Sequence, residues 1–357
     1  MLRFIIDDVK MTAQPPNTLE SSHGPSYTEN RFGKRRAEDS LSYSSSKRCR
    51  VSKISSVPLW CQPHPLSVNG LIRKHCRNRL YVHPLQWTAQ HLELLGYRFV
   101  RKSNRKLRDH SQHQHRRQNS LQLPSEATIR ATTNYLRKPS IRSFKTTIII
   151  EFLTACNAIQ LDRSCLPFDF KRQTIATVPT SGIFSHRSNT ASFAYLDLEY
   201  VGSERDKSIG LSMSKKLDGP VWRIRRKQRR RLQPSNEAED PYVAAVLIAL
   251  AQGLQHQHQK QSVNGPNEYL DSVPTKLDPT VLPRQTATDF EVRLLALARD
   301  ARSLYFYKAS IPSISLDMLN EPSHYHDTNL VLVSYHIVQL KHCKKSVQNI
   351  ESIISSL

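Results

Sequence analysis

Glycine, cysteine and acidic residues are all scarce in this chain of 357 residues, which holds only 10 Gly and 6 Cys. Six cysteines are too few for a disulfide scaffold, and none forms a C-x-x-C pair, so we expect a reducing compartment. No G-x-G-x-x-G, phosphate loop or G-x-S-x-G motif is present. These motifs mark nucleotide sites and activated serines. The sequence therefore assigns no catalytic residue, no cofactor and no metal ligand.

Long hydrophobic runs are also missing. The longest uninterrupted apolar stretch is residues 243–251, far below the roughly 20 residues that a spanning helix needs. The first apolar residues at the N-terminus are soon interrupted by two aspartates, which is unlike a signal peptide. We therefore expect an intracellular protein with no membrane contact.

Acidic residues number 30 against 52 lysines and arginines, a net charge of +22. The excess is uneven, because residues 1–235 hold 42 basic and 17 acidic side chains, whereas residues 236–357 hold 10 and 13. Excess positive charge favours polyanionic partners such as nucleic acid. The final third shows no such preference.

Two basic clusters stand in a segment that is poor in large apolar residues, residues 1–58. A segment of this composition cannot bury enough surface to order itself, so we expect a disordered basic tail. The clusters are separated by ten residues and resemble a bipartite nuclear import signal. They predict binding to a nuclear import carrier and a location in the nucleus, the alternative being a solubilising basic patch. Their members are Lys34, Arg35, Arg36, Lys47, Arg48 and Arg50.

Two further basic runs lie at residues 98–117 and 222–231. The second has seven cations in ten positions and no acid, a pattern that would bind phosphates with a strong salt dependence. Trp222 could also stack on an unpaired base. The alternatives are an exposed linker or a second import signal. The candidate nucleic-acid-binding residues are Trp222, Arg223, Arg225, Arg226, Lys227, Arg229, Arg230 and Arg231.

The segments before residue 236 are predicted as a basic, partly helical stretch at 59–140, a β-prone stretch at 141–221 and a basic linker at 222–235. Within them, an apolar stripe predicts a helix over residues 84–95. β-Branched residues predict a strand at 146–153, and alternation predicts another at 193–201.

Residues 236–357 carry the clearest pattern. Asp240 and Pro241 are typical of a helix start, and residues 242–251 are apolar all round, so this helix should be buried. Strands are predicted at 290–297, 304–311 and 329–340, a short helical turn at 315–319 and an amphipathic helix at 346–357. We therefore expect an α+β module with a small antiparallel three-stranded sheet covered by helices.

Three stretches of this module, residues 239–252, 294–307 and 309–312, carry a resemblance to a family of uncharacterised proteins from filamentous fungi. The basic run at 222–231 fits the same pattern. The family has no assigned activity, so the resemblance implies an organisation of the chain and no catalytic residue.

Two clusters could carry chemistry. Cys61, His64, His75, Cys76 and His83 are zinc-ligand types, but their spacing matches no standard zinc finger. Asp197 and Glu199 would share one face of a strand and could hold Mg²⁺ for phosphodiester cleavage, or simply face solvent. We expect a non-enzymatic nuclear protein with a C-terminal protein-interaction module and basic segments for import or nucleic-acid contact. The alternative is a metal-dependent nuclease or another unrecognised enzyme.

Overall fold

The structure is a computed structural model, and it describes residues 63–76, 79–103, 125–137, 142–155, 158–185, 191–211, 219–263 and 288–340. All of them belong to the unit of the chain that spans Ser56–Leu357. The predicted tail at 1–58 and the predicted helix at 346–357 lie outside these ranges.

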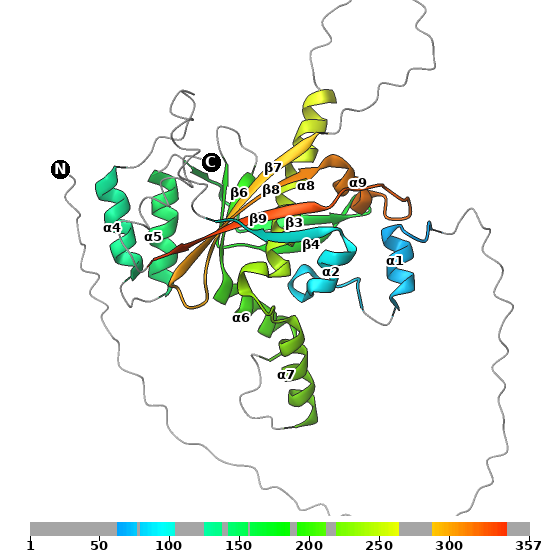
Figure 1. Ribbon diagram of the computed structural model, residues 1–357, viewed down its shortest axis with the longest axis horizontal. Helices are drawn as coiled ribbons and strands as arrows, with labels where there is room; N and C mark the ends of the chain where they lie inside the picture. The colour runs from blue at the N-terminus through cyan, green and yellow to red at the C-terminus, as the bar shows by residue number, and fades with distance from the viewer. Residues whose placement is uncertain are drawn as a thin grey trace, which may run out of the picture. The chain divides into compact units, whose positions relative to one another are not determined.

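A seven-stranded mixed sheet runs through this unit (Figure 1). Its spatial order is β1-β9-β8-β7-β6-β5-β2. The β1–β9 and β6–β7 pairs are parallel, and the other pairs are antiparallel. The strands are β1 (Tyr97–Arg101), β2 (Ile159–Gln160), β5 (Gly182–Ser185), β6 (Ala191–Asp197), β7 (Asp289–Leu297), β8 (Ser303–Pro312) and β9 (Val331–Gln339).

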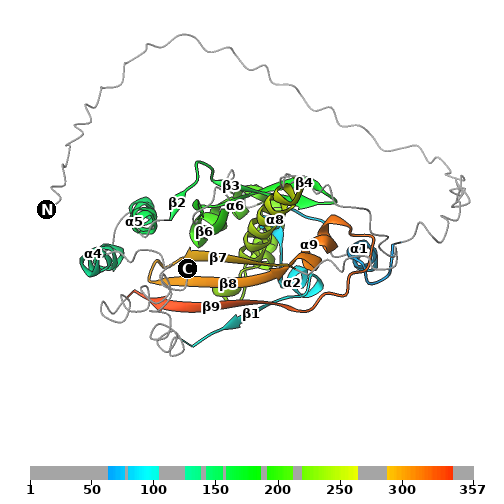
Figure 2. The same ribbon diagram turned by 90° about the horizontal axis from the view of Figure 1, so that it is seen from above.

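Helix α8 (Pro241–Val263) forms the centre of the main core. It lies between one face of the sheet and the hairpin formed by β3 (Cys165–Phe170) and β4 (Gln173–Pro179) (Figure 2). Every side chain from Tyr242 to Ala251 is at most 1% exposed. Asp240 caps the helix, because its Oδ1 accepts a hydrogen bond from the Tyr242 amide at 2.9 Å. The predicted start and full burial of this helix are confirmed.

The opposite face of the sheet is covered in part by α4 (Glu126–Arg137) and α5 (Arg142–Ala155). Residues 146–153 belong to α5, so the predicted strand there is wrong. Ile148, Ile149, Phe152 and Leu153 form a buried stripe at helical spacing that packs in a second core with sheet residues such as Phe184. This burial outweighs the preference of β-branched residues for strands.

The predicted helix over 84–95 is divided in two. A 3₁₀ turn, η3 (Pro84–Gln86), is followed by α2 (Ala89–Leu94), and Thr88 between them caps α2. The remaining helices are α1 (Val68–Lys74), α6 (Leu198–Ser208), α7 (Pro220–Leu232), η4 (Glu237–Glu239) and α9 (Ser313–Asn320). Helix α9 contains the short helical turn predicted at 315–319.

The α+β class is confirmed, but the predicted size of the sheet is wrong. The three predicted strands are β7, β8 and β9, and they do pair in antiparallel fashion. Four further strands extend them, because β6 pairs with the free edge of β7 and β1 with that of β9. The sheet therefore continues across the predicted domain boundary at residue 236. In the described part of the chain, no helix is long and apolar enough to cross a membrane.

Candidate nucleic-acid interface

Helix α7 carries all eight residues that the sequence predicts for nucleic-acid contact. The segment 222–235, predicted as a linker, is thus helical as far as Leu232. Gly219 and Pro220 begin the helix, Pro220 at a position that suits its fixed φ and missing amide proton. No residue of α7 is buried, and the helix extends from α6 away from the sheet (Figure 1).

Two arginines attach α7 to α6. The Arg225 Nη1 donates to the Gly210 carbonyl at 2.7 Å, and the Arg229 Nε forms an ion pair with Asp206 Oδ1 at 2.9 Å. Gly210 has a φ of +68°, and a Cβ there would approach the Arg225 guanidinium to 3.0 Å. A larger residue at 210 would therefore both strain the backbone and disturb the contact.

The other cations of α7 point away from this contact. One helical residue turns by about 100°, which places Arg223, Lys227 and Arg230 opposite Arg225 and Arg229. All three are exposed, as is Arg231. Among the described residues, no acidic side chain forms an ion pair with these four cations. The outward face of α7, defined as Arg223, Arg226, Lys227, Arg230 and Arg231, is thus a surface of positive charge that no acidic side chain of the described ranges pairs with.

Trp222 is not an open stacking platform. It is partly buried, and the Arg226 guanidinium lies over its ring at 5.1 Å from the centroid. This cation–π contact occupies one of the two ring faces on which an unpaired base could stack. The contact also holds Arg226 at the border of the outward face.

A buried ion pair connects α6 to the start of α8. Arg205 Nη1 and Nη2 lie 2.6 and 2.5 Å from the two carboxylate oxygens of Asp240, and Arg205 Nε donates to the Leu85 carbonyl at 2.9 Å. The two side chains are 5% and 1% exposed. Asp206 directly follows Arg205 in α6. One turn of α6 therefore contacts the start of α8 through the buried Arg205 and contacts α7 through Asp206.

Tyrosines of the sheet fix the segment between α7 and α8. The Tyr305 hydroxyl donates to Glu237 at 2.8 Å, that of Tyr307 to the Ala238 carbonyl at 2.9 Å, and that of Tyr335 to a Glu239 carboxylate oxygen at 3.0 Å. Burial raises the pKa of Tyr305 and Tyr307 above the usual range. Their hydroxyls stay protonated donors at neutral pH, and these bonds hold the segment between α7 and α8 on the sheet.

The predicted pair of strand carboxylates is not formed. Strand β6 ends at Asp197 and α6 begins at Leu198, so Asp197 and Glu199 do not share a strand face. Asp197 Oδ1 accepts from the Glu199 amide at 2.9 Å and caps α6. The strand predicted at residues 193–201 from alternating apolar and polar side chains therefore ends at Asp197, where the helix cap begins.

The described members of the His and Cys group at 61–83, all of them zinc-ligand residue types, do not form a ligand set. Between residues 63 and 340, the described residues contain no group of three His, Cys, Asp or Glu placed to hold a metal ion. His64 stacks on Tyr325 with the ring centroids 4.9 Å apart, and His83 caps η3 through its Nδ1. Cys61 lies outside the described ranges.

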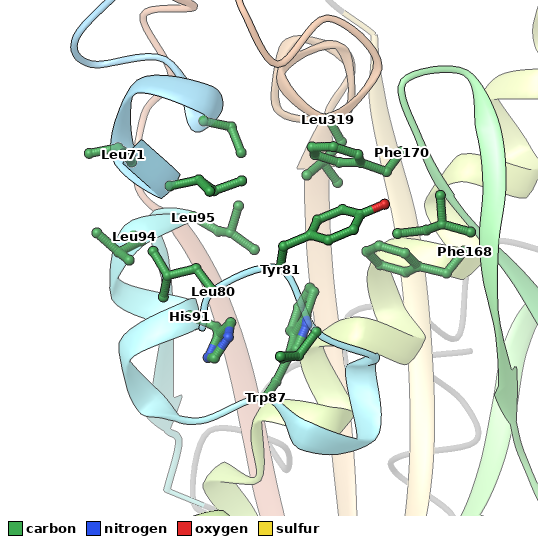
Figure 3. Close-up of a pocket in the computed structure, with 14 residues that line it drawn as sticks. Leu71, Leu80, Tyr81, Trp87, His91, Leu94, Leu95, Phe168, Phe170 and Leu319 are labelled. Carbon is green, nitrogen blue, oxygen red and sulfur yellow. The ribbon is translucent and has the colours of Figure 1, made fainter. Parts of the chain in front are cut away.

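An apolar pocket of about 70 Å³ lies between α1, α2, the β3–β4 hairpin and α9 (Figure 3). Aromatic rings from three segments line it, namely Tyr81, Trp87, Phe168 and Phe170. Trp87 and Phe168 meet edge to face with centroids 5.4 Å apart. None of the lining residues is an acid, a lysine or an arginine, so the pocket has no fixed charge to offer a ligand.

His91 is the one titratable imidazole in this lining. Its Nδ1 accepts from the Thr88 amide at 3.0 Å, and its ring stacks on Trp87 with a centroid distance of 5.9 Å. Burial lowers the pKa of His91, and backbone hydrogen bonds with Thr88 and Leu80 partly offset this decrease. The neutral imidazole is therefore part of the apolar packing.

The other basic segments are only partly described. Arg98 and Arg101 lie on the edge strand β1, followed by Lys102, and all three are exposed. The rest of the run at 98–117 is largely outside the described ranges. The six predicted import residues, at positions 34–36, 47, 48 and 50, also fall outside them.

The chain matches no family model, and neither a curated protein nor a solved structure matches it. The resemblance to a fungal family therefore stays a prediction. Sequence reasoning found the cations of α7 from their density. It missed their division into docked and outward residues, because that division depends on Asp206 and Gly210.

Proposed function

We propose that this protein is a non-enzymatic nucleic-acid-binding protein whose contact surface is the outward face of α7. The observation that carries the proposal is the division of the seven cations of α7. Arg225 and Arg229 hold the helix on α6, while five cations face outward without an acidic partner among the described residues.

The composition of this face favours phosphate as the ligand. Four of its five cations are arginines, whose planar guanidinium binds phosphate oxygens in a bidentate manner. Five like charges on one helix face repel one another, and a polyanion removes this cost. Phosphate contacts hold a protein on a nucleic acid without reading its sequence.

The base of α7 supports the same function. The Arg205–Asp240 pair and the tyrosine hydroxyl bonds fix the residues on both sides of the helix. A rigid base limits the conformational entropy lost when the helix binds a partner. The nuclear location and the import carrier remain proposals that rest on the basic clusters at 34–50. The protein-interaction module at 236–357 also stays a proposal, and its partner is unidentified.

The test is binding of a fluorescent mixed-sequence duplex, followed by polarisation at several salt concentrations. The variant replaces Arg223, Lys227, Arg230 and Arg231 by Gln. Each lost phosphate contact lowers the slope of log K against log salt by about 0.9, so the slope should fall by about 3.6 for four phosphate contacts, and by about 0.9 less for each cation that contacts a base edge instead. For four phosphate contacts at near-physiological salt, the loss of affinity is on the order of 10² to 10³.

A matched control removes the same number of exposed cations elsewhere. It carries Gln in place of Arg73, Lys74, Arg163 and Lys171, all exposed residues outside α7. This control lowers the net charge equally, so it measures the general effect of charge, while both variants keep the basic runs at 34–50 and 98–117. If both variants lose the same affinity, α7 is not the contact surface and the proposal is wrong.

A further inference from the structure

The cations of the outward face are arranged over the helix in a particular way. With about 100° per residue, they cover an arc of about 140°, bordered by Arg226 on one side and Arg231 on the other. Arg223, Lys227 and Arg230 lie between these borders. From residue 223 to residue 231 the helix rises by about 12 Å. The face is therefore broad across the helix and short along it.

This arrangement matches the major groove of a B-form duplex. The groove is about 12 Å wide and accepts a helix, whose diameter with side chains is about 10–12 Å. A helix in this groove has a phosphate strand on each side, where Arg226 and Arg231 extend. The three middle cations would face the groove floor, where arginine and lysine meet the O6 and N7 acceptors of guanine.

Two other kinds of nucleic acid fit less well. An A-form RNA duplex has a deep and narrow major groove that side chains cannot reach. A single strand is held by bases stacked on several aromatic rings, but α7 has one aromatic residue, Trp222, which is partly buried and has Arg226 over one ring face. The exposed apolar residues of α7, Val221 and Ile224, offer no aromatic ring in its place.

We infer that the ligand of the outward face is double-stranded DNA and that α7 occupies its major groove. This inference rests on the proposed function and specifies its ligand. The docking contacts are compatible with it, because Arg225 and Arg229 hold α7 from the side opposite to the arc. Groove entry thus requires no release of α7 from α6.

The experiment measures binding of the full chain to three fluorescent probes of equal length, namely duplex DNA, duplex RNA and single-stranded DNA. Because the chain has other basic runs, the measured quantity is the affinity lost in the four-site α7 variant relative to the four-site control. On duplex DNA this loss should exceed the loss on either other probe by about tenfold or more. Methyl green, which fills the major groove, should displace the protein, whereas the minor-groove ligand netropsin should not.

The outcomes separate the two claims. An equal loss on all three probes, or displacement by netropsin alone, overturns the groove inference but leaves nucleic-acid binding by α7 in place. No loss on any probe contradicts the proposed function as well. Vesicles of phosphatidylcholine and phosphatidylserine form a fourth probe. If the α7 variant loses affinity for the vesicles but for none of the nucleic acids, the outward face is a membrane-surface site and both claims are overturned.

Discussion

The buried pair of Arg205 and Asp240 allows a quantitative test of how α6 and α8 are joined. Replacing Asp240 by Asn removes the carboxylate charge but keeps an oxygen that can accept from the Tyr242 amide, since Asn caps helices as well as Asp. Arg205, with its side chain 5% exposed, then holds a buried charge without a counter-charge, although its bond to the Leu85 carbonyl remains. Breaking a buried pair in this way costs about 3–5 kcal/mol.

A small set of variants separates the contributions. Asp240→Ala should cost about 1 kcal/mol more than Asp240→Asn, because it also removes the cap. Asp206→Asn breaks only the pair with Arg229, in which Arg229 is exposed and Asp206 is half-buried, so it should cost about 1 kcal/mol. The double variant Arg205→Met with Asp240→Asn should be more stable than the sum of its single changes predicts, by about 2–3 kcal/mol.

The assay is urea unfolding of the full chain, followed by far-UV circular dichroism, with the free energy of unfolding extrapolated to water. Asp206→Asn serves as the matched control, because it removes a carboxylate charge next to Arg205 on α6 and leaves the Arg205–Asp240 pair in place. A cost for Asp240→Asn no larger than that of the control would refute the reasoning. Additive costs in the double variant would show that the two side chains do not act as a pair.

Two further predictions concern folding. A fragment of residues 236–357 lacks β6 and leaves the edge of β7 open. It should therefore aggregate or unfold without a cooperative transition. A sharp urea transition of the soluble fragment would contradict the seven-stranded sheet. Burial lowers the pKa of His91 in the folded protein below 6.5. The stability that the neutral His91 ring contributes should therefore be complete above about pH 6.5, and it should be lost as the pH falls toward the lower pKa of the folded state. His91→Asn, which can keep the bond to Thr88, should reduce the fall in the urea midpoint below pH 6.5, and an unchanged fall would contradict this role.

The parts of the fold that the sequence predicts correctly are those with strong local signals. Helix α8 has a cap, a proline at its start and ten successive buried residues. Strands β7 and β8 are long, with apolar and aromatic residues and a turn between them. In each case the signal lies within the element itself.

The missed parts depend on residues far away in the sequence. Strand β2 has two residues and β5 has four, which is too short for a periodic pattern. Residues 146–153 carry β-branched side chains that suggest a strand, although the pairs Ile148–Phe152 and Ile149–Leu153 have the spacing of a helix. That spacing was the available signal for α5.

The candidate site was predictable in composition but not in geometry. The density of arginine marks α7, yet no local pattern shows that Arg225 and Arg229 face α6. Of their partners, Asp206 lies in α6 and Gly210 lies just after it, so the pairing needs the folded contact. The opposite error occurred at Asp197, where alternation suggested a strand face and a helix cap was formed instead.

The strand order has a consequence for how the protein is made. The hairpins of β7, β8 and β9 stand in the middle of the sheet, between β6 and β1, yet they are the last described strands to leave the ribosome. Until these strands are made, β6 lacks its partner β7 and β1 lacks its partner β9. In the folded sheet Tyr97 of β1 pairs with Val331, about 230 residues later in the chain. Nascent chains should therefore depend on chaperones for a long interval. A truncation before residue 289 should leave the three strands β6, β5 and β2 with an open edge and β1 without a partner in the sheet, and such a chain should aggregate.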